Sequence, residues 1–179
     1  MAFSLSTFQS ALASGGARPS LFDLTVTGTP AGVSTTTLGS IKYFCTVSAL
    51  PPLTVTPIER QYFGRTVKIP GDMVFGDLST TIIQTEGGKE RTELEKWMQE
   101  INHTGTNTMN TDHVTSNGFA ADVTLTQYGK DSEDGAIHTI DFFDAWPSSI
   151  GPIALSYDTA SEIEQFDVTW TYNYYYYLQ

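Results

Sequence analysis

The side chains that most often bind transition metals are few in this chain: His103, His113, His138 and Cys45. Zinc sites usually take pairs of such ligands from positions roughly two to five residues apart, and no two of these four lie that close together. The single cysteine has no partner for an intramolecular disulfide, which favours a reducing compartment during folding. The sequence therefore predicts no metal site and no cofactor, and it predicts that Cys45 is a small core residue.

Acidic side chains gather at several places, but none has the pattern of a catalytic or calcium site. Residues 131–135 lack the ligand order of a calcium-binding loop, so we expect an acidic, solvated hairpin tip there. The pairs Asp141/Asp144 and Glu162/Glu164 are of a kind that twenty acidic residues produce by number alone, and glycosidase chemistry also needs a cleft. Because nucleophile-elbow, P-loop and dinucleotide motifs are missing too, the sequence predicts no catalytic residues, and an unrecognised hydrolase is only a remote alternative.

The chain is strongly acidic, with twenty acidic and nine basic residues and a net charge of −11. A protein that holds nucleic acid by its phosphates needs the opposite sign, so conventional nucleic-acid binding is excluded. Solubility alone is one explanation of the acidity. No stretch approaches the roughly 18 apolar residues of a membrane span, and the first 17 residues carry no basic residue of a secretory signal. We therefore expect no membrane insertion.

The charges are also unevenly distributed. Residues 130–179 hold nine acidic residues and one basic residue, a net charge of −8, whereas residues 41–70 hold four basic residues and one acidic residue, a net charge of +3. Opposed patches on one subunit favour head-to-tail contacts, which build rings and filaments. We therefore predict that Arg60, Arg65 and Lys68 lie at a subunit or ring interface; the alternative is that they are solvated charges of a hairpin.

Alternating apolar and polar residues predict a chain made mostly of β-strands. A hairpin is expected over Glu59–Ile69, turning near Gly64, and exposed polar loops are expected over 28–40 and 104–118. A bend is expected at Pro147 and Pro152. The expected strands are 22–27, 41–47, one or two within 73–85, one around 123–126, 137–146, and a last strand that runs from Phe166 past Asn173.

Two segments have the spacing of an amphipathic helix. In 89–103 one apolar stripe predicts a helix that lies against the sheet; the stripe is Leu94, Trp97, Met98 and Ile101. In Ser4–Ser14, Phe8 and Leu12 lie four residues apart before a Gly-Gly stop signal. So short a helix does not persist alone in water, so it must dock on its own domain or on a neighbour. We divide the chain into an N-terminal arm, residues 1–20, and a single β domain, residues 21–179.

The last strand ends in tyrosines on both faces, from Tyr174 to Tyr177. An isolated domain has little use for such a strand, whereas a subunit interface does, because tyrosine supplies a large contact area at low entropic cost. We therefore place Tyr175 and Tyr177 at a subunit interface. The predicted fold class is mainly β: an antiparallel barrel or sandwich, one amphipathic helix packed against it, and a short N-terminal helix or arm.

In order and spacing, several segments resemble the tail-tube proteins of contractile-tailed phages of the T-even type. The resemblance begins at the short N-terminal helix and extends over nearly the whole chain. Each segment alone is a weak signal, and their succession is more specific. The segments are Ala17–Phe22, Glu59–Asp72 with Gly64-Arg65 and Gly71-Asp72, Leu94–Asn102, Ala145–Pro147, Leu155–Asp158 and Ile163–Phe166, followed by the aromatic last strand.

The resemblance implies a non-enzymatic subunit that forms hexameric rings, which stack into a hollow tube inside a contractile sheath. Implied partners are further copies of the chain, the tail sheath, the baseplate tube initiator and the tail terminator, with double-stranded DNA passing through the lumen. The implied location is the virion tail, with assembly in the host cytoplasm. The N-terminal arm would contact neighbouring subunits or rings, which adds Phe8, Leu12, Arg18 and Pro19 to the expected interface.

The resemblance also implies a mechanical use for the acidity. A basic lumen would hold DNA by many phosphate contacts, whereas an acidic wall repels it within a screening length of about 8 Å. Two alternatives stay in the same mechanical class, namely the tube of a headless contractile injection particle and a baseplate tube initiator. A carbohydrate-binding β-sandwich, with the tyrosines as a sugar platform, is a more remote alternative.

Overall fold

The structure is a computed structural model that describes residues 4–12, 17–30, 32–110, 118–130, 135–159 and 162–178. The expected acidic tip at 131–134, His113 and the end of the expected loop at 111–117 lie outside these residues. The helices are α1 (Leu5–Ala11), α2 (Thr35–Phe44) and α3 (Lys89–Ile101), with a 3-10 helix at Tyr157–Thr159. The strands are β1 (Phe22–Thr27), β2 (Cys45–Ser48), β3 (Leu53–Tyr62), β4 (Arg65–Phe75), β5 (Leu78–Ile83), β6 (Asn102–His103), β7 (Thr108–Met109), β8 (Ala121–Tyr128), β9 (Ala136–Ile150), β10 (Gln165–Thr171) and β11 (Tyr174–Leu178).

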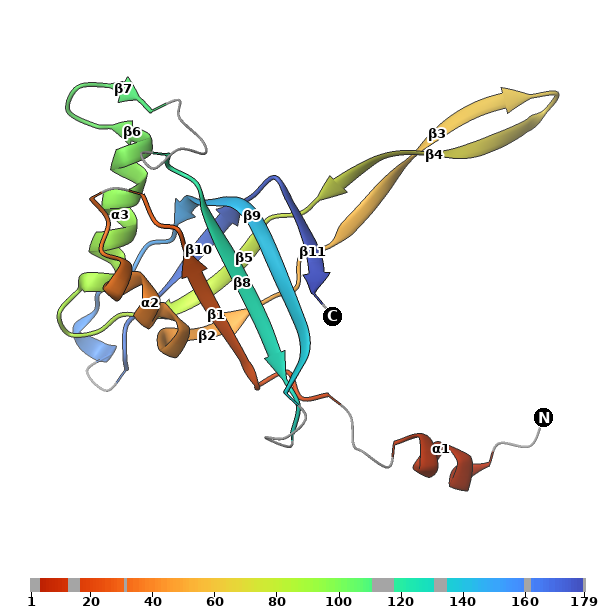
Figure 1. The fold of residues 1–179 in the computed structure, drawn as a ribbon, viewed down its shortest axis with the longest axis horizontal. Coiled ribbons are helices and arrows are strands. Elements are labelled where there is room, and N and C mark those ends of the chain that lie inside the picture. The colour runs from red at the N-terminus through yellow and green to blue at the C-terminus, as the bar shows by residue number, and fades with distance from the viewer. Residues whose placement is uncertain are drawn as a thin grey trace.

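The main sheet folds into an antiparallel sandwich of two layers (Figure 1). Its strand order is β1-β8-β9-β10-β5-β2, and β11 also pairs with β9. The first layer holds β1, β8, β11 and the first part of β9, and the second holds the end of β9 with β10, β5 and β2. The predicted sandwich is confirmed, and the sheet does not close into a barrel because β1 and β2 remain the two ends of its order.

The long strand β9 passes from one layer to the other. β10 pairs with Trp146–Ile150 and β11 pairs with Thr139–Phe143, so β10 and β11 follow the same edge of β9 as one strand with a short break. At the break Asp144 has a φ of 53°, and Asn173 Nδ2 donates to Asp144 Oδ2 at 2.8 Å. The predicted last strand thus follows the expected path, but it is not continuous. It is divided into β10 and β11 because its partner β9 bends at Asp144.

Pro147 does not mark the end of a strand. It lies within β9, opposite Trp170 of β10, and β9 continues to Ile150. The expected bend at Pro147 is therefore wrong. A proline is tolerated there because the ladder already changes register between Thr169 and Trp170, and such irregularities accept a residue that cannot donate a backbone hydrogen bond.

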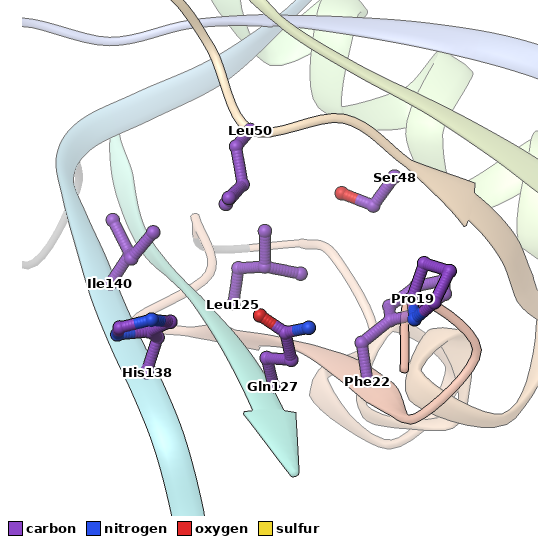
Figure 2. Close-up of a pocket in the computed structure, with 8 residues that line it drawn as sticks. All are labelled: Pro19, Phe22, Ser48, Leu50, Leu125, Gln127, His138 and Ile140. Atoms are coloured by element: carbon purple, nitrogen blue, oxygen red, sulfur yellow. The ribbon is translucent and has the colours of Figure 1, made fainter. Parts of the chain in front are cut away.

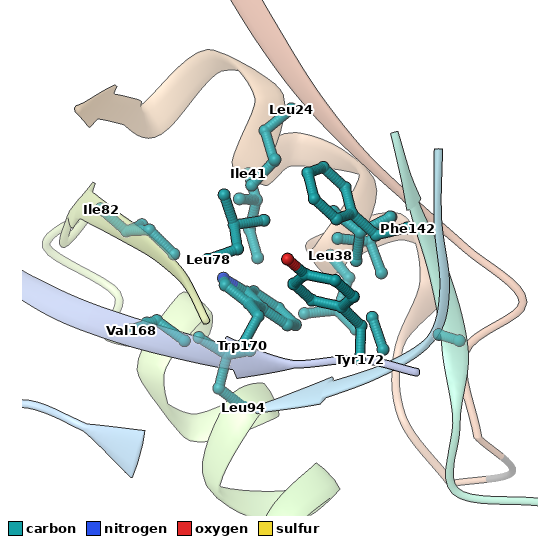
Figure 3. Packing of buried hydrophobic residues seen from close by; sticks show 14 of the residues in the cluster. Leu24, Leu38, Ile41, Leu78, Ile82, Leu94, Phe142, Val168, Trp170 and Tyr172 are labelled. Atoms are coloured by element: carbon teal, nitrogen blue, oxygen red, sulfur yellow. The ribbon is translucent and has the colours of Figure 1, made fainter. Parts of the chain in front are cut away.

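The core lies between the two layers and is completed by α2 and α3 (Figure 3). The rings of Trp97 and Trp170 meet edge to face with centroids 5.7 Å apart. Trp170 Nε1 donates to Thr80 Oγ1 at 2.9 Å, and this hydroxyl donates to the Val168 carbonyl at 3.3 Å. Trp97 Nε1 donates to the Phe119 carbonyl at 2.6 Å. Both buried indoles therefore have partners, which removes the cost of burying their N–H groups.

The helix expected over 89–103 is confirmed as α3, with an earlier end. Leu94 and Trp97 of its apolar stripe are fully buried, and Met98 and Ile101 are half-buried. The helix ends at Ile101 because Asn102 is extended and pairs with Met109 in the β6–β7 hairpin. Part of the loop expected over 104–118 is therefore this hairpin.

The expected loop over 28–40 and strand over 41–47 are wrong, because α2 spans their junction. Ser34 begins the helix as its N-cap, with its hydroxyl accepting from the Thr37 N–H at 3.4 Å. Leu38 and Ile41 are fully buried on one side of α2, so their helical spacing prevails over the alternation that follows Ile41. Strand β2 begins only at Cys45, which is half-buried against the core as expected, and burial raises the pKa of its thiol to about 11.

Helix α3 supplies the carboxylate that holds the start of α2. Glu93 Oε1 accepts from Lys96 Nζ at 2.7 Å, and its Oε2 accepts from the Ser34 N–H at 2.9 Å. These hydrogen bonds, that from Lys96 first, lower the pKa of Glu93 below its usual value. A carboxylate next to the free N–H groups of a helix N-terminus also complements the helix dipole.

Glu93→Gln is therefore expected to destabilise the fold by about 1–2 kcal/mol near neutral pH. Because the folded pKa lies below the unfolded one, the contribution of Glu93 is present above the unfolded pKa and is lost as pH falls through the folded pKa. Urea unfolding at neutral and at acidic pH measures both effects. Glu95→Gln, which removes an exposed ion pair with Arg91, is the matched control and should cost no more than about 0.5 kcal/mol. Equal losses in the two variants would contradict the capping role.

Candidate assembly surfaces

The β3–β4 hairpin projects away from the sandwich (Figure 1). All residues of β3 are exposed, and in β4 only Gly71 and Phe75 are partly buried. The predicted turn near Gly64 is confirmed, since Phe63 and Gly64 join the strands with φ of 42° and 80°. A two-residue turn with positive φ at both positions matches the twist of a hairpin. The ribbon offers two complete faces to solvent or to a partner.

The two faces of the outer hairpin differ in chemistry. One face, here called the arginine face, combines cations with apolar side chains: Ile58, Arg60, Tyr62, Arg65, Val67 and Ile69. The other, the lysine face, is polar: Glu59, Gln61, Thr66 and Lys68. Lys68 Nζ lies 3.1 Å from Glu59 Oε1 across the ladder. The register thus separates the three predicted interface cations: Arg60 and Arg65 share a face, and Lys68 lies on the opposite one with its own counter-ion.

The N-terminal arm carries an apolar stripe that its own chain does not cover. Helix α1 begins at the N-cap Ser4, and Leu5, Phe8 and Leu12 are exposed by 64%, 56% and 44%. Near the end of the arm, the carbonyl of Arg18 accepts a hydrogen bond from Gln127 Nε2 at 3.3 Å. A helix this short does not hold without a surface to dock on. The exposure of Phe8 and Leu12 is what an interface requires, but the contact itself is a prediction.

Strand β11 is an edge of the first layer. It pairs with β9, and no strand in the described ranges pairs with its other side. Tyr174 and Tyr176 lie on its outer face and stack on Phe143, with ring centroids 4.9 and 5.3 Å apart. Tyr175 faces the core, where burial raises its pKa, and Tyr177 is half-exposed. Tyr174, Tyr176 and Tyr177 are exposed by 46%, 48% and 51%. The aromatic surface open to a neighbour therefore includes the expected Tyr177 together with Tyr174 and Tyr176, whereas Tyr175 faces the core, and the contact itself stays a prediction.

A small apolar hollow lies between the layers where the arm enters the domain (Figure 2). Its volume is about 130 Å³, and it is lined by Pro19, Phe22, Ser48, Leu50, Leu125, Gln127, His138 and Ile140. Ligand sites are usually several times larger. Only His138 among these is titratable. The hollow therefore offers no acid–base pair, and Pro19, which lines it, remains exposed.

The part of the chain that the structure describes holds no candidate metal site and no helix that could span a membrane. There, no three His, Cys, Asp or Glu side chains lie close enough to hold a metal ion together. Within the same residues, the helices are too short or too polar to span a bilayer.

The outer surface of the sandwich is acidic and carries no cation. None of the nine lysine and arginine residues occurs in β1, β2, β5, β8, β9, β10 or β11. On the first layer, Asp and Thr alternate with buried aliphatic residues and form what we call the acidic face. Its members are Asp23, Thr25, Thr27, Asp122, Thr124, Thr126, Thr139 and Asp141. Alternation in the sequence marks these positions, but their gathering on one surface follows only from strand order.

Neighbouring side chains hold most of these carboxylates in place. Thr124 Oγ1 donates to Asp141 Oδ1 at 2.7 Å, and Tyr128 Oη donates to Asp23 Oδ2 at 2.9 Å. On the second layer Thr81 Oγ1 donates to Asp167 Oδ1 at 2.7 Å. All three donors are hydroxyl groups and carry no positive charge, so these hydrogen bonds do not neutralise the carboxylates. The result is a wall of positioned negative charge.

The family model for phage tail tube proteins matches residues 17–178. The chain therefore belongs to the tail tube protein family, as its motifs predicted. It is similar to tail tube protein gp19 of Enterobacteria phage T4 and to that of phage T6, with 24% identity over 162 residues in each case, covering 88% of this chain and 90% of the relative. The chain is thus a subunit of a contractile-tail tube.

Solved structures of contractile injection systems share the fold. A chain of the PVC sheath–tube complex in the extended state superimposes with a TM-score of 0.61 at 15% identity, covering 99% of each chain. The tube-terminating cap of the anti-feeding prophage gives a TM-score of 0.62 at 12% identity, covering 91% of each chain. At such identities the likeness concerns the fold alone.

Gly71→Ala tests whether the shape of the hairpin matters for assembly, independently of the stability of the fold. An added Cβ at Gly71 would lie 2.6 Å from the Thr56 carbonyl oxygen and 2.9 Å from Ile58 Cγ1, so the ribbon must change shape. Because only the base of the hairpin, at Phe75, packs against the core, we expect the free energy of unfolding of the unassembled subunit to be unchanged within about 0.5 kcal/mol while assembly is impaired. Gly39→Ala, at an open position of α2, is the control and should assemble normally. Normal assembly of the Gly71 variant would show that the hairpin's shape does not matter.

Proposed function

We propose that copies of this chain form hexameric rings that stack into the hollow tube of a phage tail, through which double-stranded DNA leaves the virion. The role is structural and not catalytic. Assembly takes place in the host cytoplasm, and the partners are the sheath, the baseplate tube initiator and the tail terminator. Family membership supports this proposal, as do three uncovered surfaces on one subunit: the stripe of α1, the β3–β4 hairpin and the edge of β11.

The observation that carries the proposed conduit is the cation-free outer surface of the sandwich. Duplex DNA carries one negative charge about every 1.7 Å along its axis, so even a few lysines on a lumen wall would bind it repeatedly as it moves. The acidic face has carboxylates at Asp23, Asp122 and Asp141 and no opposing charge. With a screening length of about 8 Å, repulsion acts close to the wall and keeps DNA from adhering. We assign the acidic face to the lumen.

The predicted interface residues near the two termini belong to contacts between subunits. Phe8 and Leu12 would lose their exposed area by docking α1 on a neighbour, with Arg18 and Pro19 directing the arm out of the domain. At the other terminus, the free edge of β11 would pair with a strand of the adjacent subunit, which would cover Tyr174 and Tyr176 on one face and Tyr177 on the other. Each contact removes apolar surface from water at about 25 cal/mol per Å². All of these contacts are heterologous, as ring formation requires.

Electron microscopy of the purified protein tests the assembly. We expect rings or tubes, and a smallest closed species of about 118 kDa, six times the subunit mass of 19.6 kDa. Deleting residues 1–12 should abolish or shorten the tubes, because it removes the stripe of α1. A monomer under all conditions would overturn the proposed function, and a monomer that binds glycans would favour the carbohydrate-binding alternative.

Asp122→Lys tests the lumen. The Asp122 carboxylate makes no side-chain hydrogen bond in the described part of the chain, so its replacement disturbs no network. Tubes of this variant should retain short DNA duplexes in a pelleting assay, and the retention should fall steeply with salt. Asp122→Asn, which removes the charge without reversing it, should retain little. Glu95→Lys makes the same charge reversal on α3, away from the acidic face; equal retention by those tubes would refute the assignment.

A further inference from the structure

The arginine face of the hairpin is built for contact, and the lysine face is not. Tyr62, Ile58 and Val67 on the arginine face are exposed by 69%, 49% and 47%, and Arg60 and Arg65 have no carboxylate within ion-pair distance in the described chain. On the lysine face, Lys68 already has Glu59 as its counter-ion. Apolar area and unpaired guanidinium groups on one side of a ribbon indicate that this side meets another surface.

The tip of the hairpin supports the same conclusion. Phe63 adopts a φ of 42°, a backbone conformation that Asn, Asp or Gly normally takes in such a turn. Its side chain is 92% exposed and rests edge-on against Tyr62, with ring centroids 4.7 Å apart. A bulky residue kept in an unfavourable backbone conformation, with almost all of its surface in water, does not stabilise the isolated subunit. Contact with a partner would account for it.

A surface of complementary chemistry lies at the other end of the same molecule. It joins exposed apolar side chains and carboxylates around three adjoining depressions of about 370, 480 and 390 Å³. We call it the acidic hollow, and its residues are Glu86, Leu155, Tyr157, Glu162, Ile163 and Glu164. Leu155 and Ile163 are exposed by 81% and 67%. Figure 1 shows the 3-10 helix of this region, Tyr157–Thr159, and the hairpin at opposite ends of the molecule.

The acidic hollow also contains an acceptor without a donor. Gln84 lines the third depression together with Glu86, Ile163 and Glu164, and its Oε1 is buried with no hydrogen-bond partner among the residues that the structure describes. A buried acceptor left unpaired costs about 1–3 kcal/mol. A guanidinium group carries several N–H donors and no acceptor, so one arginine that enters this depression can pair with a carboxylate, and a rotation of the Gln84 amide toward the depression would let it donate to Oε1 as well.

We propose that the arginine face of one copy docks in the acidic hollow of another copy. This inference rests on the proposed function and assigns the contact that repeats along the tube. Two guanidinium groups meet three carboxylates, and Tyr62 and Val67 cover Leu155 and Ile163. Because the two surfaces lie at opposite ends of the subunit, each copy engages one neighbour by its hairpin and another by its hollow. Such a head-to-tail contact does not close on itself and so propagates into a filament.

Charge exchange between copies tests the pairing. One variant reverses the hairpin (Arg60→Glu with Arg65→Glu), and the other reverses the hollow (Glu162→Arg with Glu164→Arg). Each alone presents like charges at the contact, so tube yield in quantitative electron microscopy should fall at least about tenfold. An equimolar mixture should restore tubes, because the acidic hairpin of the first fits the basic hollow of the second, and the reverse pair also matches. One chain carrying all four changes should assemble alone.

Lys68→Glu is the matched control, since it makes the same reversal on the lysine face of the same hairpin and should keep tube yield within about twofold of wild type. The reversed side chains are all exposed, and circular dichroism should confirm that each variant folds. If wild-type protein forms no rings or tubes, the proposed function fails. If wild-type protein assembles and neither the mixture nor the fourfold variant does, the docking inference alone is overturned.

Discussion

The bend of β9 is the constraint on which the rest of the structure depends. One continuous strand supplies edges to β8 in the first layer and to β10 in the second, so the two layers face each other only if β9 turns at Asp144. The left-handed backbone of Asp144 is held by the side chain of Asn173, and the Asn173 N–H donates to the Phe143 carbonyl at 3.1 Å. Beneath the bend, Phe142 packs on Tyr172 with ring centroids 4.9 Å apart.

The same aromatic cluster fixes the base of the projecting hairpin. Tyr172 Oη donates to the Gly76 carbonyl, and Phe75 at the end of β4 packs against Tyr175 with ring centroids 5.4 Å apart. Gly76 leaves no room for a side chain, since an added Cβ would lie 2.8 Å from Pro52. The hairpin therefore leaves the domain in a direction set by the core, even though its outer part contacts no other element in the described part of the chain. A docking element needs this rigidity, because a flexible ribbon would lose entropy on every contact.

Sequence reasoning succeeded where one periodicity was unambiguous and failed where two overlapped. In β1 and β10 apolar and polar residues alternate without exception, and α3 has a single stripe centred on Trp97. Around Ile41 the residues fit a helix with Leu38 and a strand with Cys45, and short apolar runs cannot be assigned by period alone. Ser34 was the available signal for a helix start, but the carboxylate that completes the start of α2 comes from Glu93, which is distant in sequence.

The candidate surfaces show the same division. Exposed apolar character at Phe8 and in the terminal tyrosines was predictable from composition, but which tyrosines face outward depended on the register of β11 against β9. The basic cluster was recognised as three charges close in sequence. The hairpin ladder separates them, because Lys68 lies opposite Glu59 whereas Arg60 lies opposite Val67. Proximity in sequence predicted that the hairpin carries the basic residues. The register of its two strands decides which face carries the cations that have no counter-ion in the described chain.

Under the proposed function, the charge distribution follows from two demands that one subunit must meet. A copy that attaches to its neighbours needs cations, and a wall that does not hold DNA must lack them, so the cations lie on the arm, the hairpin, the helices and a turn, away from the sandwich strands. Dissolved salt affects these two uses differently. Charges on an open wall are screened by the solution beside them, whereas charges enclosed between subunits are screened much less. Rising ionic strength should therefore weaken the repulsion of DNA well before it loosens the tube.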